Sequence, residues 1–195
     1  MIDQEYLERI SLPKKVYDRI ENDVNKLFHE LNYKKVPIDP LDIAKRLDYI
    51  LVPYSALTTE QVIELRKLGL DGTSFFNPKT QKYEIYYDDI FQKLARQRFT
   101  VSHEIGHIRL GHKQESALAK KMADYYAAYL LAPSPLMSNC ESYLEVRDRF
   151  YLTDQCAYAC FDRLSNWMKI SGWKPYEIEI LIQFDHSLPK GVDYL

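Results

Sequence analysis

The sequence lacks the features that would place it in a membrane or direct it out of the cell. None of its apolar runs approaches the roughly 20 residues that a membrane-crossing helix needs. The first residues, Met1 to Glu5, are acidic and contain neither the basic nor the apolar region of an export signal. We therefore expect a cytoplasmic protein that makes no membrane contact.

Cysteine is scarce, and this excludes a disulfide-stapled scaffold. The chain has three cysteines, an odd number that argues against a framework of paired bridges. Cys156 and Cys160 are four residues apart and would share a helical face, where two thiolates can bind a metal. No second cysteine pair or nearby histidine accompanies them. We therefore expect small, buried side chains at both positions.

A large charge of one sign is also missing. The net charge of −2 gives no broad basic surface, so we expect no direct binding of nucleic acid. Hydrophobic residues make up 46% of the 195 positions, which indicates a globular chain with one substantial core. We predict a domain over residues 1–136 and a helical extension over 137–195 that packs on it.

Hydrophobic periodicity predicts a mostly helical chain with a few strands. Helices are predicted over residues 14–32, 41–47, 59–68, 91–110, 117–131, 141–150 and 153–170. Strands are predicted over 49–54, 73–76 and 82–87, the last two as a hairpin, and the tail from about residue 172 is predicted to be partly extended. Asp39 is a suitable N-cap for the second helix, with Pro40 at its first position.

The most informative stretch runs from His103 to His112, His-Glu-Ile-Gly-His-Ile-Arg-Leu-Gly-His. His103 and His107 are four residues apart, so on a helix they project about 40° from each other and can bind one Zn²⁺. Glu104 follows the first histidine and is placed to act as general base on a water held by that metal. This is the H-E-x-x-H signature of zinc-dependent peptidases, and Gly111 is a plausible end of its helix.

A zinc peptidase also needs an exposed strand along which an extended substrate can align. We therefore expect the hairpin over residues 73–87 to lie beside the motif helix. The predicted fold class is α+β: a mostly helical, zincin-like metallopeptidase with a small antiparallel sheet beside the helix that carries the metal site.

Two stretches in this order resemble the ImmA/IrrE family of zinc metallopeptidases. They are Gln97 to His112, which contains the H-E-x-x-H motif, and Ala123 to Pro133 (Ala-Asp-Tyr-Tyr-Ala-Ala-Tyr-Leu-Leu-Ala-Pro), and the similarity spans roughly residues 14–136. The resemblance implies a cytosolic protease with Zn²⁺ or Mn²⁺ as cofactor. It also implies a protein substrate, a helix-turn-helix repressor of mobile-element or stress-response genes.

The chain departs from that family at one important position. The family usually supplies an acidic third metal ligand four residues before the Asn or Asp of its second motif, and counting back from Asp124 reaches Lys120. A protonated lysine has no lone pair to donate and repels a cation. Met122, where many members carry a second acid, offers only a weak thioether.

Three substitutes are open for the third ligand, beside a site that has no third protein ligand. Asp124 lies one turn beyond Lys120 on the same helical face, although the two residues could equally form an ion pair. His112 follows Gly111 directly, which does not match the metzincin spacing. Glu115 would lie nearly opposite Asp124 on a continuous helix, and two histidines completed by water are the last option. We take His103, His107 and Asp124 as the predicted metal ligands.

The leading hypothesis is a zinc endopeptidase in which Glu104 is the catalytic base, with a tyrosine or His112 as an oxyanion partner. A second hypothesis is an inactive relative that binds a regulatory partner without cleaving it, because Lys120 replaces the acidic ligand. A third is a DNA-binding regulator that uses residues 141–170, although packing or partner contact is favoured there because the segment lacks a dense basic face.

Overall fold

The structure is a computed structural model that describes residues 12–114, 116–168 and 173–184, and the chain divides into two compact units. One unit runs from Asp39 to Ala127, and the other joins the described residues up to Ile38 with those from Ala128 onward. The boundary between Ala127 and Ala128 lies inside a helix. The predicted division into domains at residue 136 stays a prediction.

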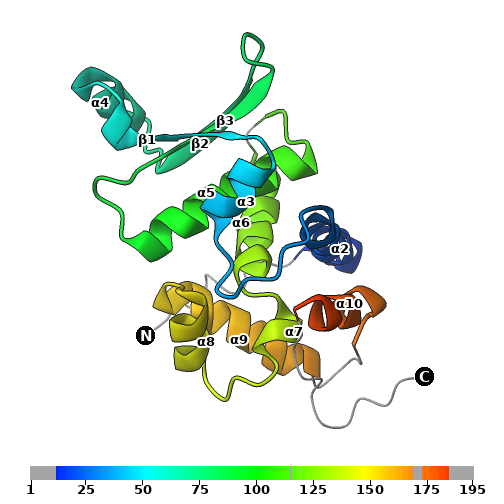
Figure 1. Ribbon diagram of the computed structural model, residues 1–195. Coiled ribbons are helices and arrows are strands. Elements are labelled where there is room, and N and C mark those ends of the chain that lie inside the picture. The colour runs from blue at the N-terminus through cyan, green and yellow to red at the C-terminus, as the bar shows by residue number, and fades with distance from the viewer. Residues whose placement is uncertain (1–11, 115, 169–172, 185–195) are drawn as a thin grey trace. The chain divides into compact units, whose positions relative to one another are not determined.

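The unit from Asp39 to Ala127 holds the sheet and the motif helix (Figure 1). In chain order its elements are α3 (Pro40–Arg46), β1 (Ile50–Pro53), the 3-10 helix η1 (Tyr54–Ala56), α4 (Thr59–Lys67), β2 (Gly72–Asn77), β3 (Lys82–Tyr87), α5 (Leu94–Leu110) and most of α6 (Ala117–Leu131). These bounds confirm the helices and strands predicted for this part of the chain to within a few residues. Asp39 caps α3 as predicted, because its carboxylate accepts the backbone N–H of Leu41 at 3.0 Å.

The three strands form a mixed sheet in the order β1-β3-β2. β2 and β3 are the predicted antiparallel hairpin, with Phe76 opposite Tyr83. β1 pairs with β3 in parallel, with Leu51 opposite Ile85, so the expectation of a wholly antiparallel sheet was wrong on this point. The reason is that η1 and α4 separate β1 from the hairpin, and a connection of that length allows the crossover that a parallel pair requires.

Helix α5 packs against β2 and β3, which confirms the predicted position of the sheet beside the motif helix (Figure 1). Ile85 of β3 and Val101 and Ile105 of α5 are fully buried. Gly72 is the first residue of β2 and lies against Thr100 of α5. A Cβ there would overlap the side chain of Thr100, so only glycine permits this approach.

Helix α5 begins at Leu94, three residues later than the predicted start at Phe91. The carboxylate of Asp88 accepts the backbone N–H groups of Ile90 and Phe91, both at 3.0 Å, and so holds this segment in a turn. Arg66 donates to the same carboxylate at 2.8 Å. Burial alone would raise the pKa of Asp88, but these hydrogen bonds outweigh it and leave the pKa below its ordinary value.

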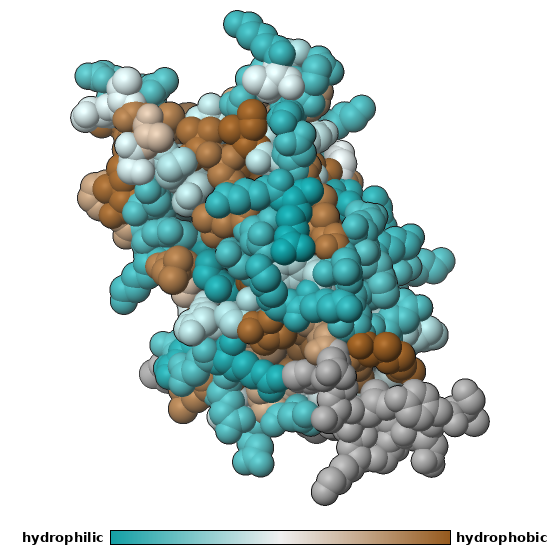
Figure 2. Space-filling view, in the orientation of Figure 1, coloured by the Kyte–Doolittle hydropathy of each residue, from teal (hydrophilic) through white to brown (hydrophobic). Residues whose placement is uncertain are grey.

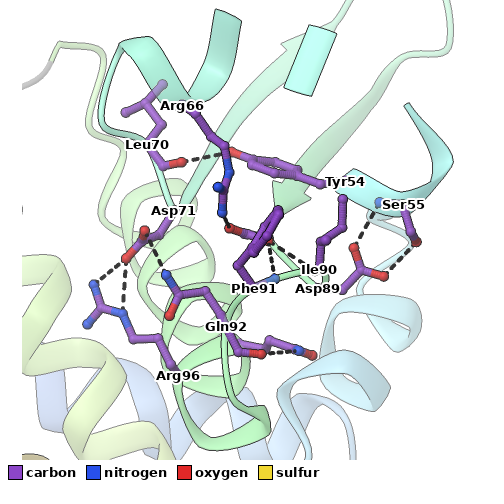
Figure 3. Close-up of polar contacts among 12 residues, drawn as sticks. Tyr54, Ser55, Arg66, Leu70, Asp71, Asp89, Ile90, Phe91, Gln92 and Arg96 are labelled. Atoms are coloured by element: carbon purple, nitrogen blue, oxygen red, sulfur yellow. Dashed lines mark hydrogen bonds and ion pairs between the residues drawn. The ribbon is translucent and has the colours of Figure 1, made fainter. Parts of the chain in front are cut away.

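Two further carboxylates, those of Asp71 and Asp89, make polar contacts in the same corner of the unit (Figure 3). Asp71 accepts from both Gln92 and Arg96, the latter through two nitrogens at 2.7 and 3.1 Å, and thereby ties the start of β2 to the start of α5. Asp89 accepts the backbone N–H and the hydroxyl of Ser55. These contacts fix where the motif helix begins relative to the sheet.

The second unit is helical in its described residues. Its elements are α2 (Lys14–Glu30), the end of α6, α7 (Ser134–Met137), α8 (Tyr143–Phe150), α9 (Asp154–Met168) and α10 (Pro175–Gln183). α8 packs against α9, and α10 packs against α2 and α7. The predicted helices 14–32, 141–150 and 153–170 correspond to α2, α8 and α9, while residues 169–170 lie outside the described part.

Helix α10 corrects the expectation of an extended tail from residue 172. Its alternating isoleucines resemble a strand pattern, but the buried residues are Glu177, Ile180 and Leu181, which follow helical spacing, and Ile182 is 64% exposed. Pro175 stands at the first helical position, where its missing N–H costs nothing. Residues 185–195 of the predicted tail lie outside the described part of the chain.

The surface of the described chain is mixed in character (Figure 2). On the face shown, apolar side chains emerge among hydrophilic ones over the unit that contains the sheet. The exposed large hydrophobic residues of the described chain include Ile63, Leu68, Phe75, Phe76 and Phe91. Of the described helices, none is both long and apolar enough to cross a bilayer.

Candidate metal centre

The two motif histidines lie one turn apart on α5 and face each other. Nε2 of His103 is 2.9 Å from Nε2 of His107. Two nitrogen ligands of a tetrahedral Zn²⁺ would be about 3.3 Å apart, so a small outward movement of the rings makes room for the ion. The donor set therefore fits a divalent metal bound through the two Nε2 atoms.

Asp124, on α6, contacts the ring of His103 at the edge opposite to the one that faces His107. Its Oδ1 lies 2.8 Å from Nδ1 of His103, and both side chains are mostly buried. A carboxylate in this position accepts the Nδ1–H of the ring and so leaves Nε2 with a free lone pair. The prediction that Asp124 is the third ligand stays a prediction, and the structure adds this orienting contact.

The motif glycine allows α6 to come this close. A Cβ on Gly106 would lie 2.9 Å from Cβ and 3.0 Å from Cγ of Tyr126, closer than such atoms pack in proteins. Gly106 therefore sets the spacing between α5 and α6 at the level of His103 and Asp124. The glycine at this position within H-E-x-x-H has a packing reason that the sequence pattern does not reveal.

The second histidine has a partner of its own. Nδ1 of His112, just beyond the end of α5, lies 3.1 Å from Nδ1 of His107. Burial, together with the neighbouring imidazoles of His103 and His112, lowers the pKa of His107 to about 4. The ring is therefore neutral near pH 7, which is the form that donates a lone pair to a metal.

Glu104 is 7% exposed and is held by the sheet. Ser74 of β2 donates its hydroxyl to Oε2 of Glu104 at 2.6 Å, a short, charge-assisted hydrogen bond. Sequence reasoning did not identify Ser74. The only signal is its place in the middle of the predicted hairpin, because the contact depends on how β2 lies against α5.

A cavity of about 460 Å³ opens beside Glu104 and His107, within the range typical of ligand sites. One wall is the outer strand β2 with Tyr83 of β3, and the other is the end of α5 and the loop that follows it. Ser74 and Phe76 share a face of β2, because side chains alternate along a strand. The wall beyond Ser74 is therefore apolar.

A comparison with known protein families gives a match over this region. The IrrE N-terminal-like domain of peptidase family M78 matches residues 60–149, which include the whole motif helix and α6. This part of the chain, just under half of its length, is therefore similar to that family. No curated protein matches the chain. The family confirms the predicted resemblance and supports a metallopeptidase-type function for the IrrE-like domain.

The IrrE-like domain brings together His103, His107, Asp124 and His112, which the sequence offered as predicted or candidate metal ligands. Lys120 is exposed on α6, one turn before Asp124, and Met122 is half-buried. Glu115 lies outside the described residues. Across residues 12–114, 116–168 and 173–184, no three His, Cys, Asp or Glu side chains are arranged to hold a metal ion together.

Proposed function

We propose that the chain is a metal-dependent endopeptidase whose ion, Zn²⁺ or Mn²⁺, is held by His103 and His107. The observation that supports this proposal is the 2.9 Å approach of the two Nε2 atoms beside the buried carboxylate of Glu104. When bound, such an ion polarises a carbonyl and lowers the pKa of water toward about 7.

Glu104 would move the proton in this reaction. Its carboxylate accepts a proton from the attacking water and returns it to the amine that leaves when the peptide bond breaks. Ser74 donates a hydrogen bond to one oxygen of this carboxylate, and this bond also fixes the orientation of the other oxygen. Asp124 contacts Nδ1 of His103, and His112 contacts Nδ1 of His107. Each contact helps to orient its ring so that the two Nε2 atoms face each other.

The substrate would be an extended polypeptide. β2 is an edge strand, and such a strand can pair with an added strand through its outer backbone groups. A peptide aligned there passes over Glu104 and His107, and the adjoining cavity would receive one of its side chains. We propose a helix-turn-helix repressor as this substrate, which is what the family resemblance implies.

A second candidate function keeps the fold without catalysis. Lys120 stands where the resemblance places an acidic ligand, and no three metal-binding groups converge in the described residues. Both observations favour an impaired relative that binds a regulatory partner without cleaving it.

One experiment separates the two functions. The purified protein is incubated with Zn²⁺ or Mn²⁺ and a cognate helix-turn-helix repressor, and products are mapped by mass spectrometry. Cleavage that disappears in Glu104→Gln supports the peptidase, since the amide cannot accept the proton. Glu64→Gln, an exposed glutamate on α4, is the matched control and should cleave normally. Tight binding with no cleavage supports the impaired relative instead.

A further inference from the structure

The end of helix α5 places His112 against His107 by means of its backbone. The N–H of His112 bonds to the carbonyl of His107 at 3.0 Å, and the N–H of Gly111 bonds to the carbonyl of Ile108 at 3.1 Å. Gly111 has a φ of 71°, in the left-handed region. This pair of bonds around a left-handed glycine is the Schellman motif.

In a Schellman motif the side chain after the glycine commonly contacts the side chain at the third position from the helix end, usually through apolar groups. Those two positions are here occupied by His112 and His107, and the contact is polar: the two Nδ1 atoms are 3.1 Å apart. The helix stop therefore does more than end α5. It delivers a hydrogen-bonding group to the edge of His107 that points away from His103.

We infer that His112 is a positioning residue for the metal, and that it acts by holding His107 with Nε2 turned toward His103. This inference rests on the proposed metal site. A neutral imidazole that gives its Nε2 lone pair to an ion carries its hydrogen on Nδ1, and that hydrogen needs an acceptor. Nδ1 of His112 is at the right distance to accept it.

The position of His112 also argues against a role as ligand in the same site. A single imidazole cannot direct both of its nitrogens at one ion, because they lie on different edges of the ring. His107 turns Nε2 to His103 and Nδ1 to His112. An ion between His103 and His107 therefore has His112 behind the second ring, as Asp124 is behind the first.

The test is the affinity for Zn²⁺, measured by competition with a chromogenic chelator on the full chain. His112→Phe keeps a ring but removes the acceptor, and His112→Asn keeps an acceptor atom at the branch position of Nδ1. We expect His112→Phe to bind Zn²⁺ about 10- to 100-fold more weakly, the usual effect of losing such a partner, and His112→Asn to recover most of that loss. His29→Phe, at an exposed histidine of the other unit, is the control and should bind as the wild type does.

The possible results are distinct. If wild type and His112→Phe bind Zn²⁺ with equal affinity, the inference is overturned and the metal site stands. The inference is also overturned if His112→Asn binds Zn²⁺ as weakly as His112→Phe does. Complete loss in His112→Phe, as in His103→Ala, overturns it in favour of a ligand role. If the wild type itself binds no Zn²⁺, the proposed function fails and takes the inference with it. Melting temperatures of the metal-free variants show whether each one folds.

Discussion

Nδ1 of His103 on α5 lies 2.8 Å from Oδ1 of Asp124 on α6, so the two helices meet through a hydrogen bond at the proposed metal site. This contact is on the edge of the ring opposite to the one that faces His107. It gives Asp124 a role in orienting the first predicted ligand, in addition to its predicted role as a ligand.

Substitution of Asp124 distinguishes these roles. An asparagine keeps an oxygen that accepts the Nδ1–H of His103, but it is a poor metal ligand. If Asp124 orients the ring, we expect Asp124→Asn to keep Zn²⁺ affinity within about tenfold, whereas Asp124→Ala loses roughly 10- to 100-fold. Chelator competition measures both variants. Equal, complete loss in the two would show that Asp124 is a ligand.

Lys120 provides a test of whether the site lacks an acidic ligand. Lys120→Glu restores the residue type that the family resemblance implies and removes a positive charge one turn before Asp124, so we expect at least a tenfold gain in Zn²⁺ affinity. Lys121→Glu makes the same change of charge one residue along α6, on a different face, and is the matched control. A similar gain in Zn²⁺ affinity in both variants would show that the effect comes from the change in net charge alone.

Ser74 is expected to matter for turnover and not for metal binding. Removing its hydroxyl in Ser74→Ala breaks the 2.6 Å bond to Glu104, and hydrogen bonds to a charged group contribute about 1.5–3 kcal/mol. We therefore expect kcat for peptide cleavage to fall roughly tenfold or more, with unchanged Zn²⁺ affinity. Ser55→Ala removes a comparable, exposed bond to Asp89 and should leave kcat unchanged. A wild-type kcat in Ser74→Ala would contradict the positioning of Glu104 by β2.

Gly106→Ala should destabilise the protein through a steric overlap. The added Cβ would lie 2.9 Å from Cβ of Tyr126, and such overpacking costs about 1–3 kcal/mol. Gly69→Ala is the control, because its Cβ meets nothing within 4 Å and only the left-handed backbone at φ 68° is penalised, by about 1 kcal/mol. Urea unfolding compares the two. A smaller loss in Gly106→Ala than in Gly69→Ala would show that α6 moves aside freely.

The second unit contains a titrating group that links its stability to pH. Burial, with the nearby charge of Glu21 acting in the same direction, raises the pKa of Glu177 from 4.5 to about 7. Below pH 4.5 the carboxyl is protonated in both the folded and the unfolded state. Between pH 4.5 and 7 only the unfolded state ionises, so the free energy of unfolding falls as pH rises, by roughly 3 kcal/mol in all.

Glu177→Gln should remove this dependence. The amide oxygen still accepts the backbone N–H of Lys174, which the carboxylate accepts at 2.9 Å, but it never ionises. We expect the variant to match the wild type near pH 4.5 and to be more stable at pH 8, as measured by urea unfolding at each pH. Glu179→Gln, at an exposed position on the same helix, should follow the wild type. Parallel curves for Glu177→Gln and wild type would contradict the raised pKa.

Much of the site follows from local spacing. His103 and His107 share a face because a helix advances 3.6 residues per turn, and Glu104 follows from the same motif. The hairpin and the end of α5 at Gly111 also follow from short-range signals, because turns and helix stops depend on a few neighbouring residues. In α10 local alternation was misleading, since packing against α2 and α7 decides which side chains are buried.

The amino-acid sequence by itself determined that one helix presents two imidazoles and a carboxylate at metal-binding spacing, because these residues are covalent near neighbours. Only the tertiary structure placed Ser74 on Glu104 and Asp124 on His103. Ser74 is 30 residues from Glu104 along the chain, and the contact between them depends on how closely Gly72 lets the sheet approach α5. The contact between Asp124 and His103 depends in the same way on Gly106, which lets α6 approach α5. The distance between packed elements is set by the volumes of the side chains between them, and the spacing of residues along the sequence does not predict it.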